Sequence, residues 1–183
     1  ALVGAKVAAL KGMDYGGIAF VAAVSALSGG TFRNLALQMK VAWVSHPYLL
    51  IAVLLAVIFV IALSSGPIGK IALTLDSIGL AFAAVAGVYL SLQHGAELFA
   101  AVVLGVLSAV LGGLIRDVLC QTPPVLLHRE TNGTATLLGA LVFAVLYKLE
   151  LQIAVNSLIS GAVVMGIRLV SIKYKWNLPK LKK

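Results

Sequence analysis

Charged residues are scarce in this chain, and so is cysteine. Only 11% of the 183 residues are charged, whereas 61% are hydrophobic. Soluble globular proteins carry about 25% charged residues, so this chain has too little polar surface to cover a water-soluble globule. The single cysteine, Cys120, excludes a disulfide within the chain. Together these shortages predict a protein whose solvent is the lipid bilayer.

Residue patterns of catalysis and metal binding are also missing. The three histidines, His46, His94 and His128, lack the spacing of metal ligands. Serine, histidine and aspartate occur, but without the spacing of a nucleophile elbow or a catalytic triad. We therefore expect no enzyme activity, no metal site and no cofactor.

Six apolar runs approach or reach about 20 residues, the length that spans a bilayer as a helix. The chain is therefore predicted to be an all-α polytopic membrane protein. The predicted helices cover residues 17–37, 49–64, 71–92, 96–119, 133–149 and 152–172. The first ten residues match only the second half of the run at 71–92, so a further helix at the start is expected to be truncated.

An internal duplication lies within these runs. The thirteen residues from Ser25 to Leu37 recur in the same frame from Ser108 to Cys120. Each copy contains two adjacent glycines and, three residues after them, an arginine. Because each copy holds three spans, an odd number, the second copy enters the membrane in the opposite sense.

The predicted organisation is one transmembrane domain over residues 1–183. It is an inverted repeat of three plus three transmembrane helices followed by a seventh helix. Repeat one covers about 1–65, repeat two about 70–149, the extra helix about 152–172 and a basic tail 173–183.

The glycine pairs are predicted to interrupt their helices. Glycine disfavours helix by about 1 kcal/mol relative to alanine, and broken backbone survives in a membrane only where protein covers it or water reaches it. An arginine at mid-membrane costs at least about 2.5 to 3.5 kcal/mol, so neither arginine is expected to face lipid. Close helix packing by small residues is the alternative explanation. We expect a central pore around both breaks, with candidate residues Ser28, Gly29, Gly30, Arg33, Asn34, Gly112, Gly113, Arg116 and Asp117.

Partners for these charges are predicted from helix geometry. Neighbouring residues on a helix point about 100° apart, so we expect Arg33 to pair with Asp117 of the other repeat, and Arg116 with Asn34. Asp76 is expected to be an acid in the first turn of its helix, which balances the helix dipole, and is a secondary candidate for the site.

Basic residues predict how the chain sits in the membrane. Five of the fourteen lie in the last eleven residues, a tail that suits anionic lipid and requires no nucleic acid. Arg168, near the end of the last span, is expected to extend its charge to this interface. Counting spans back from a cytoplasmic tail leaves only Arg33, Lys40 and Lys148 on the outer side. Because basic residues favour the cytoplasmic side, we expect a protein of the cell membrane with a cytoplasmic tail.

The chain resembles a prokaryotic member of the trimeric intracellular cation (TRIC) channel family. Its segments Ser28-Gly-Gly-Thr-Phe-Arg33 and Leu111-Gly-Gly-Leu-Ile-Arg116-Asp117 are similar to the family signature Gly-Gly-Gly-x-x-Arg-Asp. Similar too are Leu75-Asp76-Ser-Ile-Gly-Leu80 and Thr122-Pro-Pro-Val-Leu-Leu-His-Arg-Glu130. The resemblance implies a homotrimer that conducts monovalent cations, potassium above all, passively through a pore within each protomer.

Two other functions stay open on the sequence alone. Inverted repeats and broken helices suit a secondary transporter of a small zwitterion such as glycine equally well. A membrane scaffold that transports nothing would have less reason to hold arginines inside the membrane.

Overall fold

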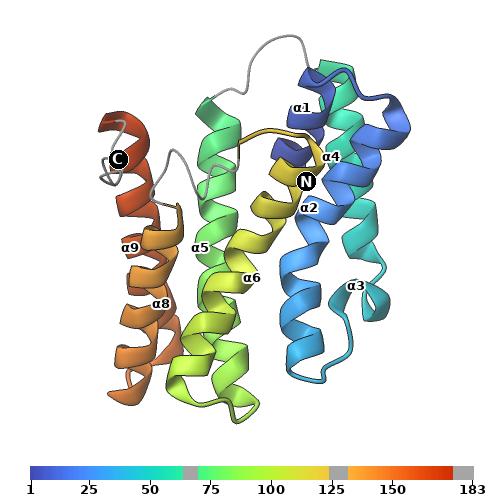
Figure 1. Ribbon diagram of the computed structural model, residues 1–183. Coiled ribbons are helices and arrows are strands. Elements are labelled where there is room, and N and C mark those ends of the chain that lie inside the picture. The colour runs from blue at the N-terminus through green and yellow to red at the C-terminus, as the bar shows by residue number, and fades with distance from the viewer. Residues whose placement is uncertain (64–69, 124–131, 175–183) are drawn as a thin grey trace, which may run out of the picture.

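The apolar runs form helices, as their length predicts. The computed structural model describes residues 1–63, 70–123 and 132–174, and within these ranges there are eight helices (Figure 1). They are α1 (Leu2–Leu10), α2 (Tyr15–Ala36), α3 (Ala42–Ser45), α4 (Tyr48–Leu63), α5 (Lys70–Gln93), α6 (Leu98–Leu119), α8 (Asn132–Lys148) and α9 (Ile153–Tyr174). The predicted all-α fold is confirmed.

Four of the described helices are long and apolar enough to cross a membrane. These are α2, α6, α9 and residues Leu73–Gln93 of α5. Helices α4 and α8 are apolar as well, but shorter, with 16 and 17 residues. Large apolar side chains on α4 stay exposed in the protomer, among them Ile51, Leu54, Leu55, Ile58 and Phe59. A helix that is apolar on its outward faces requires lipid or protein around it.

The duplication extends to the backbone at the helix ends. Adding 83 to the bounds of α2, 15 and 36, gives the bounds of α6, 98 and 119. After these helices, Gln38 and Gln121 adopt left-handed φ values of 54° and 49°. The next amide donates back to Asn34 O at 2.8 Å in one copy and to Asp117 O at 2.9 Å in the other. Both ends are therefore the same helix-terminating turn, in which the left-handed residue closes the last carbonyls.

The second repeat is inverted relative to the first. In Figure 1, α2 runs from top to bottom and its counterpart α6 from bottom to top. The pairs α1 with α5 and α4 with α8 are also antiparallel to each other. The predicted three-plus-three inverted repeat is confirmed.

Helix α9 lies outside the repeat and packs beside α8 and α5 (Figure 1). Its buried Asn156 donates to the carbonyl oxygen of Phe143 in α8 at 3.0 Å. Ser160, one turn later, donates to Asn156 Oδ1 at 3.0 Å. Buried polar groups of this kind are satisfied in only one register, so they fix where α9 sits on repeat two.

Candidate functional site

The backbones of α2 and α6 touch where the two helices cross. A Cβ on Gly29 would overlap the carbonyl oxygen of Ser108, and a Cβ on Gly112 would overlap that of Ser25. These two contacts are related by the repeat. One glycine of each pair therefore serves close packing, which only a residue without a side chain allows.

The predicted interruption of these helices is wrong as far as unwinding is concerned. Helix α2 is continuous from Tyr15 to Ala36, and α6 from Leu98 to Leu119. Because the helical hydrogen bonds are intact, the backbone carbonyls of these segments do not need water as a hydrogen-bond partner. Packing against the partner helix stabilises each glycine pair in the helical state by more than the glycine propensity costs.

The other glycine of each pair faces a cavity of about 430 Å³ between the repeats. No atom lies within 4 Å of where a Cβ on Gly30 would be. At about 30 Å³ for each molecule, the cavity has room for roughly 14 water molecules. Eight of the ten candidate residues line it: Gly29, Gly30, Arg33, Asp76, Gly112, Gly113, Arg116 and Asp117.

Ser28 and Asn34 are the two candidates that do not line this cavity. The hydroxyl of Ser28 is buried near Gly112, and within the described residues it has no hydrogen-bond partner. Asn34 is buried and donates to the carbonyl oxygen of Lys40 at 2.8 Å.

Each arginine pairs with its own neighbour in the chain. Arg116 Nη2 lies 2.8 Å from Asp117 Oδ1, and its Nε lies 2.9 Å from the same oxygen. Arg33 makes the equivalent bonds to Asn34 Oδ1, at 2.8 and 3.0 Å. The predicted pairs between repeats, Arg33 with Asp117 and Arg116 with Asn34, are wrong. The long arginine stem folds back across the rotation of about 100° that separates neighbouring residues of a helix with 3.6 residues per turn.

The two pairs differ in charge although they share one geometry. Arg116 faces a carboxylate, so the second repeat carries a compensated pair that is almost fully buried. Arg33 faces a neutral amide and is only half-buried. The site is therefore electrostatically asymmetric.

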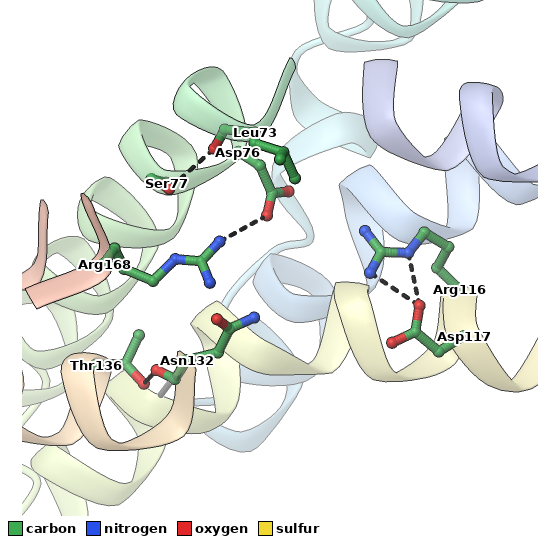
Figure 2. A network of polar contacts seen from close by, with 8 residues as sticks. All are labelled: Leu73, Asp76, Ser77, Arg116, Asp117, Asn132, Thr136 and Arg168. Carbon is green, nitrogen blue, oxygen red and sulfur yellow. Dashed lines mark hydrogen bonds and ion pairs between the residues drawn. The ribbon is translucent and has the colours of Figure 1, made fainter. Parts of the chain in front are cut away.

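Asp76 does not lie in the first turn of its helix. Helix α5 begins at Lys70, so the predicted role of Asp76 beside the helix terminus is wrong. Its carboxylate instead lies 3.5 Å from Nη2 of Arg168 on α9 (Figure 2). Arg168 is only 1% exposed, so the prediction that its side chain reaches the membrane interface is also wrong.

A second cavity of about 350 Å³ adjoins the first. Arg168 and Lys11 line this cavity but not the first one. Five residues line both cavities and so form the wall between them: Val3, Asp76, Arg116, Asp117 and Asn132. Three charged residues of the site, Asp76, Arg116 and Asp117, thus lie where the two cavities meet.

Sequence reasoning missed two members of this site. Asn132 begins α8, and its Oδ1 is buried without a hydrogen-bond partner among the described residues. Arg168 was assigned to the interface because it lies near the end of an apolar run. Most of the segment Thr122 to Glu130 and the tail after Tyr174 lie outside the described residues.

Comparison with known proteins identifies the family. A family profile described as "Glycine transporter" matches residues 1–64 and 73–148. The UPF0126 inner membrane protein YadS of Escherichia coli K12 is 33% identical over 97% of this chain and 92% of its own length. The TRIC trimeric intracellular cation channel orthologue from Rhodobacter sphaeroides superposes with a TM-score of 0.89 at 34% identity, over 96% of this chain and 92% of that one. The chain belongs to the TRIC family.

A further TRIC structure agrees over the whole chain. It was solved to explain conductance through TRIC cation channels, and it matches with a TM-score of 0.91 and 30% identity over 100% of this chain and 91% of that one. These TRIC structures are of ion channels and not enzymes, so the prediction that the chain is not an enzyme is confirmed. With relatives named as membrane proteins and several apolar spans, the chain is a multi-pass membrane protein.

Proposed function

We propose that this TRIC-family protein is a passive channel for monovalent cations, potassium above all, with a pathway through each protomer. The observation that carries the proposal is the cavity between the inverted repeats, which both glycine-arginine motifs line. A polar cavity of this kind at a pseudo-two-fold axis is where membrane transport proteins bind what they carry.

The arrangement of charge in the site is compatible with cations. Two bare arginines would repel potassium, but Arg116 is compensated by Asp117 at 2.8 Å. Arg33 is bonded by the amide oxygen of Asn34. The side chain of Asp76 is 33% exposed and faces the cavity. Carboxylate and carbonyl oxygens are the groups that replace water around a permeating cation.

The assembly and membrane placement belong to the same proposal. The Rhodobacter orthologue is described as trimeric, and we expect this chain to form a homotrimer in contact with membrane lipids, with residues 1–183 as one channel domain. The ends of the helices at the top of Figure 1, near Lys11, are expected to face the cytoplasm together with the basic tail.

Transport of a small zwitterion is the second candidate. The description of the matching family profile, "Glycine transporter", favours it, and the cavity offers Arg33 for a carboxylate and Asp76 for an ammonium group. A coupled transporter needs a proton or sodium gradient to drive its substrate, whereas a channel passes an ion down the gradient of that ion alone.

Flux measurements on liposomes separate these two functions. Purified protein in potassium-loaded liposomes is expected to release potassium down its gradient with no proton or sodium gradient, while empty liposomes retain it. Glycine is expected not to compete. Glycine uptake that depends on a proton or sodium gradient, with no potassium release, would reject the channel in favour of the transporter.

A further inference from the structure

The wall between the two cavities joins the repeat to the helix outside it. Asp76 comes from α5 of repeat two, and Arg168 comes from α9, which has no counterpart in repeat one. Figure 2 shows the guanidinium group of Arg168 between the carboxylate of Asp76 and the side chain of Asn132. Arg168 therefore adds a charge to the site that the duplication itself does not contain.

The ion pair leaves the carboxylate of Asp76 accessible. Its separation of 3.5 Å is longer than the 2.7 to 2.9 Å, approximately, of a close charge-assisted hydrogen bond. The side chain of Arg168 is 1% exposed, whereas that of Asp76 is 33% exposed. Asp76 lines both cavities, and Arg168 only the second. An ion in either cavity can therefore approach the carboxylate of Asp76, whereas the guanidinium of Arg168 is more deeply buried.

The charged side chains described on each cavity give the two cavities different net charges. The first cavity is lined by Arg33 and Arg116 together with Asp76 and Asp117, so these charges balance. The second is lined by Lys11, Arg116 and Arg168 against the same two acids, which leaves one positive charge in excess. Arg168 is the most buried of these three basic side chains, at 1% exposure, and a cation that passes the wall moves against its charge.

A second observation points to a cation at the wall. Asn132 lines both cavities, and its side-chain oxygen is buried and accepts no hydrogen bond from the described residues. Together with the carboxylate of Asp76, it provides a pair of oxygen acceptors at the junction. Hard monovalent and divalent cations are bound by such oxygens.

We propose that Asp76 selects cations over anions where the two cavities meet, and that Arg168 limits the current by holding a fixed positive charge against it. This inference rests on the proposed channel function and names the residues that tune it. Charges in a narrow, low-dielectric passage act strongly on passing ions. They act most at low ionic strength, since the screening length falls from about 10 Å at 0.1 M to about 3 Å at 1 M salt.

Charge-neutral variants in planar bilayers test the proposal. Asp76→Asn is expected to lower the permeability ratio of potassium to chloride by about tenfold, measured as the reversal potential in a KCl gradient. Arg168→Gln is expected to raise the potassium conductance at low KCl about twofold or more, and to change it little at high KCl. Arg168→Lys retains the charge and is expected to behave like the wild type.

Controls separate this effect from general surface charge and from misfolding. Glu97→Gln and Lys148→Gln remove exposed charges that line neither cavity, and both are expected to leave the ratio and the conductance unchanged. Size-exclusion chromatography and thermal melting establish that each variant is folded. The double variant Asp76→Asn with Arg168→Gln removes both charges together, and it is expected to show the low selectivity of Asp76→Asn.

Two results would overturn the inference. One is an unchanged permeability ratio in folded Asp76→Asn. The other is a low-salt conductance in folded Arg168→Gln that is equal to or below that of the wild type. A wild-type protein that carries no potassium current at all would instead reject the channel function itself, so the two failures are distinguishable.

Discussion

Gly29 of α2 lies against the carbonyl oxygen of Ser108 in α6, so closely that even a methyl group has no room there. The repeat reproduces this contact between Gly112 and Ser25. Two backbone contacts, one for each repeat, therefore set how the two central helices cross. The second glycine of each pair, Gly30 or Gly113, makes no such backbone contact with the partner helix and lines the cavity.

The first prediction compares the two glycines of one pair. Gly29→Ala is expected to destabilise the protein by about 1–3 kcal/mol or more, because the added methyl overlaps backbone that cannot move aside. Gly30→Ala adds its methyl to open space and is expected to be neutral, or to stabilise the helix by up to about 1 kcal/mol. Thermal unfolding in detergent measures both variants, and equal melting temperatures would contradict the proposed contact.

The second prediction concerns the buried pair of α6. Asp117→Ala leaves Arg116 buried without its carboxylate and is expected to cost about 3–5 kcal/mol. Asp117→Asn keeps an oxygen acceptor, the arrangement that Arg33 has with Asn34, and is expected to cost about 1–3 kcal/mol. Unfolding by denaturant in detergent compares them. A loss in Asp117→Asn as large as that in Asp117→Ala would show that the charge, and not the acceptor, holds the arginine.

The sequence predicted the architecture well because the fold depends on patterns that are local. Apolar runs indicated the bounds of the helices within a few residues, and the duplicated motif indicated the inverted repeat. The cavity residues followed from the same motif, since seven of its nine candidates line the cavity.

Most of the errors concern which groups meet in space. Angles between neighbouring helix positions argued against a bond from Arg116 to Asp117, but the arginine stem is flexible enough to fold back. Arg168 pairs with Asp76, 92 residues away, and no periodicity within either helix contains that contact. The packing of α9 against α5 decides it, and α9 is the one spanning helix of the described chain that the repeat does not predict.

The third prediction concerns the attachment of α9. Asn156→Ala removes the donor to the carbonyl oxygen of Phe143 and the acceptor for Ser160, and is expected to cost about 1–3 kcal/mol. Leu158→Ala on the exposed face of α9 is the matched control, and is expected to change stability by less. Thermal melting in the same detergent compares the two. A greater loss in Leu158→Ala would mean that the polar contacts do not hold α9 in place.

The fourth prediction concerns orientation in the membrane. Lys11 directly follows α1, Lys148 ends α8, and both are exposed. In Figure 1 the end of α1 and the end of α8 lie at opposite ends of the helix bundle. In a background with Cys120→Ala, a cysteine at position 148 is expected to react with a membrane-impermeant maleimide on intact cells. A cysteine at position 11 is expected to react only after permeabilisation. The reverse labelling would place the basic tail outside, against the expected excess of basic residues on the cytoplasmic side.

Single-channel recording tests the central claim most directly. Purified wild-type protein in a planar bilayer between unequal KCl solutions, with no proton or sodium gradient, is expected to give discrete unitary currents that reverse close to the potassium equilibrium potential. Such currents require a passive pathway for cations, because a coupled transporter turns over too slowly to produce them. Silent bilayers, made with protein that takes up glycine under a proton or sodium gradient in liposomes, would contradict the account.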